Sequence, residues 1–365
     1  MTRCRNHLPS RDPTNTVNMT DWHGLFESPE AFREGFVNRL ERMLREYQGL
    51  GVFILVLANA SYDELIYRRL VTPLRQRFED LAARMRADLQ AGRPLGDAPD
   101  DVLVFLKLMA VGFDDLPLTR FRQADGFELQ FNLLRAFRPA RMSDAVVKEL
   151  HKPFDPSGFH FNKPFLQKEV FWEGELLGRQ CRLLYNKFPF AELHALLVID
   201  PQDDKPQWLR ENDHLAIWEI TEALGRSLPG VGFAYNAYGA FSSVNHQHFQ
   251  MFVRAQGEYP VESADWRHAG GEEAYPLECH CFDDVERAWA GIRQLHQEKR
   301  AYNLLYRPGR LYVLPRKFQG SYRHSSWTSG FAWSEVCGAV TTFNAEDFTA
   351  LDGRAIRDEM ARLKD

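Results

Sequence analysis

The sequence has few cysteines, no long apolar run and no large excess of charge. Its 5 cysteines are irregularly spaced over 365 residues, an odd and sparse set that favours a reducing compartment over a disulfide framework. The longest strongly apolar stretch, residues 50–60, is much shorter than the roughly 18 residues that indicate a membrane span. Residues 1–18 are polar and lack the apolar core of a signal peptide. These absences predict a soluble, cytoplasmic protein.

The charge balance excludes one large class of partners. The chain has 45 basic and 50 acidic residues, a formal charge of −5, so it creates no general field that attracts nucleic acid. We therefore expect neither a nucleic-acid nor a membrane partner. A hydrophobic content of 44% is enough to bury a core, which excludes disorder as the default state.

The length favours more than one structural unit. We expect a flexible lead-in over residues 1–18, a helical N-terminal region over 19–100 and the main domain over 101–365. The Gly-, Pro- and Asp-rich segment 92–101 is the expected linker. Within the helical region, apolar side chains recur at a spacing of three to four residues, as in Phe36, Leu40, Met43, Leu44 and Tyr47.

A second helical run begins near residue 65. Its pattern predicts a helix that is broken by Pro73 and ended by Gly92.

The pattern changes after residue 101, where strand-like runs with Val, Phe, Tyr or Leu are bounded by Gly, Pro or Asp. They cover residues 128–137, 169–174, 181–186, 194–200, 233–244, 246–254, 302–309 and 310–316. Helix-like segments lie between them at 213–227 and 283–299. Residues 181–201 and 301–317 both read as strand, turn, strand, which suggests two related halves. We therefore predict an α+β fold with antiparallel sheet and flanking helices.

The segment with the most chemical information is YNAYGAFSSVNHQHFQMFVR, residues 235–254. If residues 246–254 form a strand, His246, His248 and Gln250 share one face, and the apolar Phe249, Met251 and Val253 share the other. The apolar face would lie in the core. Upstream, Gly239, Ser242 and Ser243 could offer backbone N–H groups and hydroxyls to phosphate oxygens.

Three interpretations of this histidine row are open from its chemistry. The two imidazoles are structural hydrogen-bonding groups in the first. In the second they bind a metal, although the other candidate ligands (His194, His214, Cys279, His280 and Cys281) have no zinc-like spacing. In the third, one histidine attacks phosphorus, which needs a free ring nitrogen and nearby neutral donors for the phosphoryl oxygens.

The motif His-x-His-x-Gln resembles the transferase branch of the histidine-triad superfamily. That branch contains galactose-1-phosphate uridylyltransferase, diadenosine tetraphosphate phosphorylase and the GDP-hexose phosphorylases. The run YNAYGAFSSVNHQHFQ is most similar to the GDP-hexose phosphorylases, and two further blocks agree with it, YNKFPFAELHALLVIDP (185–201) and FAWSEVCG (331–338). The resemblance covers roughly residues 128–350. It implies a histidine-triad-like fold of two related halves.

The resemblance also implies a role for each matching residue. His248 would be the nucleophile that accepts a nucleoside monophosphate, His246 would orient the site, and Gln250 would hold the phosphoryl oxygens of the covalent intermediate. The nucleotide would be bound by Ser243, with Ser242 and Gly239 beside it, by Asn236 and by Asn186. His194 matches a strand histidine with a structural role.

Two cationic side chains are candidate phosphate ligands on weaker grounds. Lys187 follows Asn186, although an exposed lysine in a turn explains it equally well. Arg316 follows a strand that would end near the site if the two halves pack as repeats; a solvated side chain is the alternative.

The activity that the resemblance implies is transfer of a nucleotide from a nucleoside diphosphate-sugar, favouring a GDP-hexose, to phosphate. The alternatives are diadenosine tetraphosphate phosphorylase activity, a silent nucleotide-binding regulator and a metalloenzyme. The sequence departs from plant-type relatives at Gln247, where they have an apolar residue, and at Ser242–Ser243, which leaves the base and the sugar open. The mechanism requires no cofactor and nothing indicates a divalent metal. A homodimer is expected from the resemblance alone.

Overall fold

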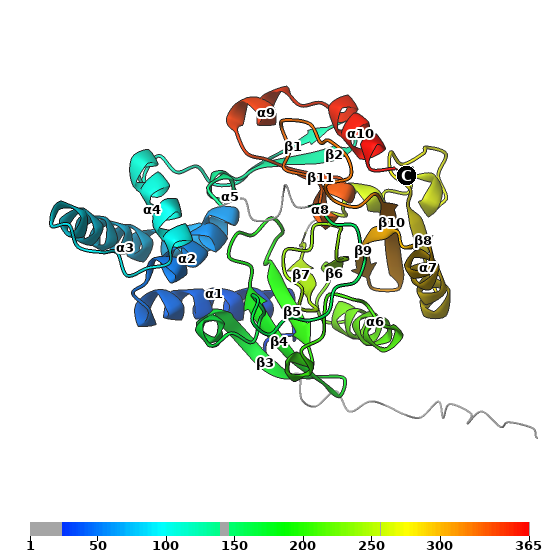
Figure 1. Cartoon of the computed structure of the whole chain (residues 1–365), viewed down its shortest axis with the longest axis horizontal. Helices are drawn as coiled ribbons and strands as arrows, with labels where there is room; N and C mark the ends of the chain where they lie inside the picture. The colour runs from blue at the N-terminus through cyan, green and yellow to red at the C-terminus, as the bar shows by residue number, and fades with distance from the viewer. Residues whose placement is uncertain (1–23, 139–145, 256, 365) are drawn as a thin grey trace, which may run out of the picture.

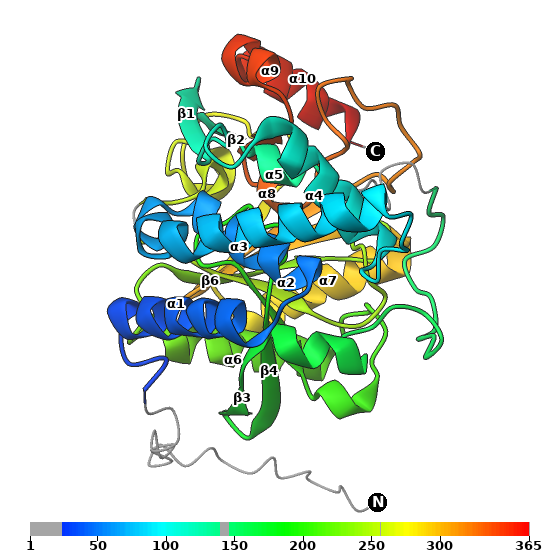
Figure 2. The same cartoon turned by 90° about the vertical axis from the view of Figure 1, so that its left-hand side faces the viewer.

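The computed structural model of the chain describes residues 24–138, 146–255 and 257–364. The expected lead-in over residues 1–18 lies outside them. Four helices form the N-terminal part (Figure 1) and lie together in Figure 2: α1 (Pro29–Glu46), α2 (Leu50–Tyr62), α3 (Glu64–Gln90) and α4 (Pro99–Val111). Among the described helices, none is both long and apolar enough to cross a bilayer.

The helical prediction is confirmed, with one correction. On α1, Phe36, Leu40, Met43 and Leu44 are buried, as their spacing predicts, and the Ser28 hydroxyl caps the helix by accepting from the Ala31 N–H at 3.1 Å. The prediction of a break at Pro73 is wrong. Helix α3 continues through this residue, because tertiary packing of its buried face outweighs the lost backbone hydrogen bond.

The helices share a hydrophobic core with the large sheet. Phe36 of α1 packs against Tyr185 with ring centroids 4.7 Å apart, and the Tyr185 hydroxyl donates to the Phe36 carbonyl at 2.6 Å. Helix α4 crosses the expected boundary at residue 100. The division into domains stays a prediction.

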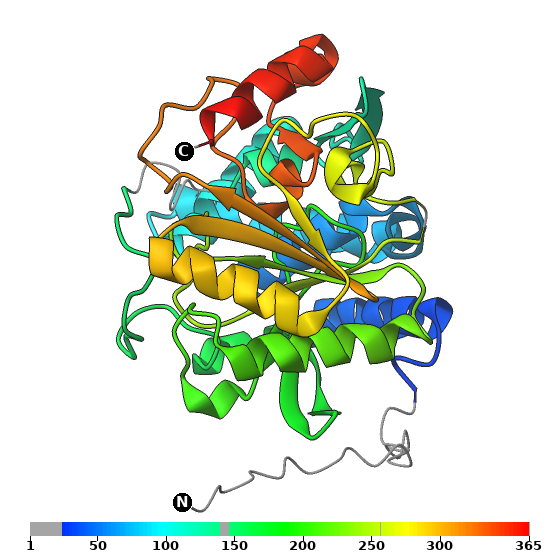
Figure 3. The ribbon, with the colours of Figure 1, turned by 90° about the vertical axis from the view of Figure 1, so that its right-hand side faces the viewer.

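The large sheet has eight strands in the order β3-β4-β5-β7-β6-β9-β10-β8, and all neighbours are antiparallel. Helix α6 (Glu211–Gly225) precedes β6, and α7 (Val285–Glu298) precedes β9. Both lie along one face of the sheet (Figure 3). The strands are β3 (Val170–Leu176), β4 (Arg179–Tyr185), β5 (Ala195–Ile199), β6 (Val231–Asn236), β7 (Phe249–Val253), β8 (His280–Phe282), β9 (Ala301–Arg307) and β10 (Arg310–Arg316).

This topology confirms the α+β class and the two related halves. The series β5–α6–β6–β7 and β8–α7–β9–β10 each run strand, helix, strand, strand. In the sheet, the order β5-β7-β6 is followed by its mirror image, β9-β10-β8. The hairpin that corresponds to β9–β10 is therefore β6–β7, and not β4–β5 as the sequence suggested.

Three strand predictions were too long. Strand β6 ends at Asn236, so residues 237–244 do not continue it, and β7 begins at Phe249, so the two histidines precede the strand. Residues 128–137 divide between β2 (Phe127–Phe131) and the short helix α5 (Leu133–Ala136).

A small second sheet lies over the other face of the large one (Figure 1). Strand β2 pairs with β1 (Arg120–Ala124) in antiparallel and with β11 (Ala339–Thr342) in parallel orientation. The rest of this part is formed by α8 (Trp333–Val336), α9 (Ala345–Ala350) and α10 (Gly353–Arg362).

The alternation along β7 decides what each face of the large sheet carries. Phe249, Met251 and Val253 pack into the core on the helix side, as predicted. Phe252 packs into the second core on the opposite side, with Trp333. Gln250 also projects to this second side, which carries the candidate site.

Candidate functional site

The histidine motif lies where the β6–β7 hairpin opens into the connection 237–248. Gly239 makes this turn, with φ of +90°, and a Cβ there would lie 2.5 Å from the Phe318 ring. Only glycine fits such a position without strain. Gln319 stabilises the turn. Its side-chain oxygen accepts from the Phe241 N–H at 2.9 Å, and its backbone N–H donates to the Gly239 carbonyl at 2.8 Å.

A buried glutamine, Gln207, fixes the backbone of the motif. Its side-chain oxygen accepts from the His248 N–H at 3.0 Å, and its Nε2 donates to the Asn236 carbonyl at 2.8 Å and to the His248 carbonyl at 3.3 Å. Gln207 thus replaces the ladder hydrogen bonds that are lost where β6 and β7 separate. It holds Asn236 and His248 next to each other.

The surroundings of His248 determine which of its ring nitrogens can react. Nδ1 lies 2.8 Å from the His246 carbonyl, an acceptor, so Nδ1 carries the proton and Nε2 carries the lone pair. Burial lowers the pKa of His248 to about 4, so the ring is neutral near pH 7. A neutral imidazole with a defined nucleophilic nitrogen is the result.

His246 has the opposite tautomer. Its Nδ1 accepts from the Phe161 N–H at 3.1 Å, which leaves the proton on Nε2. Burial lowers its pKa to about 4, and its ring stacks on Phe161 with centroids 5.7 Å apart. His246 thus contributes its carbonyl to His248 and a ring N–H to its surroundings.

His194 fixes the amide of Gln250. The Phe190 N–H donates to His194 Nδ1 at 3.2 Å, so the proton lies on Nε2, which donates to Gln250 Oε1 at 2.7 Å. Burial lowers the pKa of His194 to about 3, so this tautomer persists at neutral pH. With its oxygen held, the two N–H groups of Gln250 are left for another acceptor.

Asn186 also contacts the side chain of Gln250. Its Nδ2 donates to Gln250 Oε1 at 3.4 Å, and its Oδ1 accepts from the Phe188 N–H at 3.0 Å. The structure therefore brings together Asn186 and Gln250, two residues that the sequence placed in one site, and adds His194, for which the sequence gave only a structural role. Asn186 follows β4, His194 precedes β5 and Gln250 lies in β7.

Asn236 and Arg316 are linked through a residue that the sequence analysis missed. Asn303 of β9 donates to Asn236 Oδ1 at 2.7 Å and accepts from Arg316 Nη1 at 3.3 Å. Asn236 Oδ1 also accepts from the Trp333 N–H at 3.0 Å, so its amide N–H groups remain for a ligand. Arg316 is fully buried and also donates to the Tyr322 hydroxyl at 2.9 Å.

The other predicted site residues are placed less closely. Ser242 is buried and its hydroxyl donates to the Val244 carbonyl at 3.0 Å, whereas Ser243 is exposed. Lys187 forms an ion pair with Asp101 of α4 at 2.5 Å. Its ammonium is therefore directed toward the helical region.

Gln247, the departure between the two histidines, has a structural explanation. Its side-chain amide donates to the Trp208 carbonyl and to Asp213 Oδ2, both at 3.1 Å. Asp213 in turn pairs with Lys205 at 2.9 Å. Because a charged network lies under this position, a polar residue replaces the apolar one expected there.

Segment 146–163 covers the histidines. Asn245 Nδ2 donates to the carbonyls of Lys152 and Pro153 at 3.1 and 2.9 Å, and the Phe161 ring meets the His248 ring edge-on at 5.0 Å. This cover leaves the side chains of His246 and His248 buried. It keeps their local dielectric constant low, which explains the lowered pKa values.

The described residues contain no cluster of three or more His, Cys, Asp or Glu side chains that could hold a metal ion. Cys279, His280 and Cys281 lie at β8, where His280 pairs with Glu278 at 2.9 Å. They are far along the sheet order from β7.

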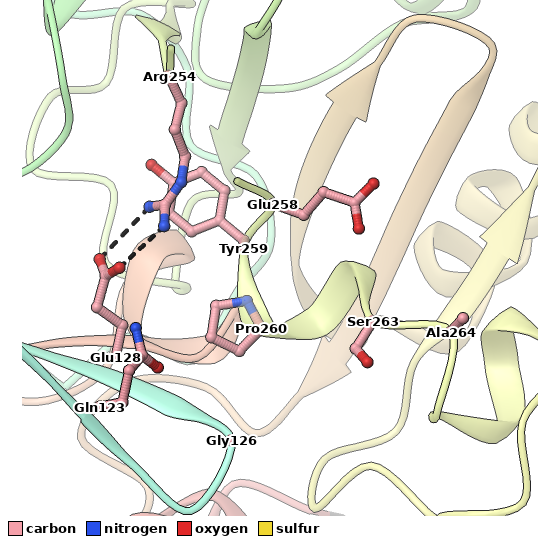
Figure 4. A pocket seen from close by; sticks show the side chains of 9 residues that line it. All are labelled: Gln123, Gly126, Glu128, Arg254, Glu258, Tyr259, Pro260, Ser263 and Ala264. Carbon is pink, nitrogen blue, oxygen red and sulfur yellow. Dashed lines mark hydrogen bonds and ion pairs between the residues drawn. The ribbon is translucent and has the colours of Figure 1, made fainter. Parts of the chain in front are cut away.

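A cavity of about 260 Å³ lies at the other end of β7 (Figure 4). Arg254 follows the strand there and pairs with Glu128 at 2.9 Å. Glu258 also lines this cavity. Because Arg254 is neutralised by Glu128 and Glu258 adds a second carboxylate, this cavity does not suit an anionic ligand.

The comparisons with known proteins match the part of the chain that contains the motif. Residues 121–252 match the family model described as GDPGP1-like, N-terminal domain. GDP-D-glucose phosphorylase 1 of Danio rerio is 31% identical over 140 residues, which cover 38% of this chain and 39% of that protein. The human protein of the same name is 33% identical over 149 residues, covering 39% and 37%.

These matches confirm the resemblance to the GDP-hexose phosphorylases over this segment, which spans about two fifths of the length of the curated relatives. The fold is also similar to the crystal structure of yeast Ap4A phosphorylase Apa2, with a TM-score of 0.48 and 15% identity, over 73% of this chain and 94% of that one.

Proposed function

We propose that the chain is a nucleotidyltransferase of the phosphorylase type, with a GDP-hexose as donor and phosphate as acceptor. The observation that carries the proposal is the state of His248, a buried neutral imidazole whose Nδ1–H is held by the His246 carbonyl and whose Nε2 has a lone pair. The relatives named GDP-D-glucose phosphorylase 1 support the choice of donor.

The first step is attack of His248 Nε2 on the α-phosphorus of the donor. The N–P bond forms as the bond from this phosphorus to the bridging oxygen breaks, and hexose 1-phosphate leaves with the electron pair. The imidazole ring becomes cationic because Nδ1 keeps its proton. The His246 carbonyl stabilises that charge through its hydrogen bond with Nδ1–H.

The second step reverses the first with another partner. An oxygen of inorganic phosphate attacks the same phosphorus, the N–P bond breaks, and its electron pair returns to Nε2. The product is a nucleoside diphosphate. Two in-line displacements at one site predict ping-pong kinetics.

Two amides would stabilise the phosphoryl group in both steps. Gln250 and Asn236 each have their oxygen occupied by protein donors, so their N–H groups are available for the phosphoryl oxygens. An amide donates hydrogen bonds but does not shuttle a proton to or from water as an imidazole does. This property favours transfer over hydrolysis.

The experiment is product analysis by chromatography. The full chain is incubated with GDP-glucose and phosphate, and in parallel with diadenosine tetraphosphate and phosphate. We expect GDP and glucose 1-phosphate in equal amounts, and no product with His248→Asn, which keeps an N–H donor for the His246 carbonyl but has no Nε2.

Faster turnover of diadenosine tetraphosphate would overturn the choice of donor. Binding of both donors without any product would contradict an enzymatic role and support a nucleotide-binding regulator.

A further inference from the structure

A second cavity, of about 270 Å³, lies next to the histidines. Phe161 lines it, and the ring of this residue also contacts both His246 and His248. The cavity is thus separated from the His248 imidazole by the Phe161 side chain.

The residues that line this cavity differ in charge from those that line the cavity in Figure 4, where two carboxylates accompany one paired arginine. Lys163 and Arg182 line it together with the amides of Asn162, Gln167 and Gln202, and among the described residues no carboxylate does. Lys163 Nζ donates to a neutral group, the Pro156 carbonyl, at 3.0 Å. Arg182 is paired with Glu173, whose carboxylate also accepts from Gln167 Nε2 at 3.5 Å. Lys163 is therefore the lining cation without a carboxylate partner among the described residues, and it suits an anion that also carries hydroxyl groups.

The sheet register places the cavity beyond the reacting nitrogen. Arg182 pairs with Val198, and the β5–β7 register continues from Leu197↔Phe249 toward His248. At the spacing of neighbouring strands, the backbones of Arg182 and His248 are about 10 Å apart. The guanidinium of Arg182 is held by Glu173 of β3 and donates through Nη1 to Asn162 Oδ1 at 2.8 Å.

Asn186, which the resemblance assigns to the nucleoside, lies in the other direction along the same face. Asn186, Leu184 and Arg182 alternate on one face of β4, and Leu184 is level with Leu196 and hence with Gln250. From Asn186 the order along the face is therefore Gln250, then His248 with Arg182. A donor with its ribose at Asn186 and its α-phosphorus at His248 would extend its second phosphate toward the cavity.

The side chain of Phe161 lies between the cavity and His248. Its N–H donates to His246 Nδ1 at 3.1 Å and its carbonyl accepts from Arg182 Nη1 at 3.3 Å, so its backbone is fixed to both sites. Its ring is held by packing alone, against Leu184 and Val198 among others. Rotation of the side chain would connect the cavity with His248.

We propose that this cavity is the subsite for the phosphate-bearing partner of both steps, a hexose 1-phosphate that leaves and the inorganic phosphate that enters. The proposal rests on the proposed function, because one phosphorus and one nucleophile require the two partners to occupy the same in-line position. Lys163 binds the phosphate, Arg182 fixes the position of Asn162 and the Phe161 carbonyl beside it, and Gln167 and Gln202 face the sugar hydroxyls.

Titration calorimetry of the full chain with glucose 1-phosphate, and separately with inorganic phosphate, tests the subsite directly. We expect Lys163→Gln to weaken binding of both by about tenfold, the effect of one lost charge-assisted hydrogen bond. Gln202→Glu, which adds a charge at an exposed position of the cavity, should act in the same direction without removing any contact of Lys163.

The matched control is Lys168→Gln. Lys168 lies five residues away and is partly exposed like Lys163, but it does not line the cavity. We expect this variant to bind both ligands within about twofold of the wild type, since an isolated surface charge has little effect. Wild-type affinity in both cavity variants, equal losses in Lys168→Gln, or no binding to the wild type would overturn the subsite.

The proposed function is read out separately, as the mass that GDP-glucose adds to the wild type. If GDP-glucose adds no mass while the cavity variants still lose affinity for glucose 1-phosphate, the proposed function fails and the anion subsite stands. If the mass appears, and phosphate releases it from Lys163→Gln and from the wild type at the same concentration, the proposed function stands and the anion subsite fails.

Discussion

Replacing Gln250 by glutamate tests the amide without changing the shape of the side chain. In the structure, Gln250 Oε1 accepts from His194 Nε2 at 2.7 Å, and a carboxylate oxygen can accept the same hydrogen bond. The substitution removes the two N–H donors that we assign to the phosphoryl group. It therefore separates the proposed role in transfer from the contact with His194.

The expected loss follows from the number of donors removed. Loss of one donor to a developing negative charge typically lowers the rate by about 10²- to 10³-fold, and an ionised carboxylate at the same place also repels the phosphoryl oxygens. We expect the rate of nucleotidyl transfer to His248 to fall by at least about 10²-fold. His194→Phe should lose about tenfold, because the amide keeps its donors and loses only its fixed orientation.

The assay is rapid-quench mass spectrometry of the first step with GDP-glucose at pH 8. Gln90→Glu, the same change at an exposed position at the end of α3, is the control and should leave the rate unchanged. If folded Gln250→Glu forms the adduct at close to the wild-type rate, Gln250 is not a phosphoryl donor and the reasoning from His194 is wrong.

Three further predictions concern stability and the turn. Burial lowers the pKa of His194 to about 3 and of His214, His246 and His248 to about 4. The unfolded chain therefore binds more protons than the folded chain below pH 6.5, and each of these histidines lowers the free energy of unfolding by about 2 kcal/mol at pH 5. His296, whose pKa burial also lowers to about 4, acts in the same direction. The free energy of unfolding in urea should therefore be highest above pH 6.5 and fall as the pH is lowered to 5, and a pH-independent value between 7 and 5 would contradict it. Gln207→Ala leaves the His248 N–H and the Asn236 carbonyl without their partner, and urea unfolding should show a loss of about 2–5 kcal/mol; a loss below that of a surface Gln→Ala variant would exclude the brace. Gly239→Ala should lower both stability and product formation through its clash with Phe318, whereas Gly178→Ala, at φ of +76° with open space around it, should affect stability alone; equal product formation in both variants would exclude a role of the turn in the site.

The residues that the sequence identified best are those whose chemistry and spacing are local. The apolar stripe of α1 and the alternation of Phe249, Met251 and Val253 are short-range patterns, and the structure buries them as expected. Asn186 and Gln250 are 64 residues apart along the chain and meet in the structure. Only the resemblance to a family placed them together, because no local pattern joins two strands.

The residues that brace the site could not be found in this way. Gln207 lies in a polar loop before α6 and resembles any surface glutamine until its two contacts with β6 and β7 are known. Asn303 had a detectable signal, an amide inside the apolar strand β9, since a buried polar side chain in a strand needs a partner.

The strand limits were wrong for a physical reason as well. Periodicity reports which side chains are apolar, but it does not report where a hairpin separates. The histidine row precedes β7 because Gln207 takes over the hydrogen bonds of His248 and Asn236 at that point. The alternate spacing of His246 and His248 therefore reflects one turn of a loop, in which the carbonyl of the first holds the ring of the second.

The most direct test of the central claim is the intact mass of the purified chain after brief incubation with GDP-glucose in the absence of phosphate. We expect the added mass of one GMP, its disappearance when phosphate is supplied, and no addition in His248→Asn. An unchanged mass in the wild type under conditions where GDP-glucose is bound, or an equal addition in His248→Asn, would contradict a covalent step on His248.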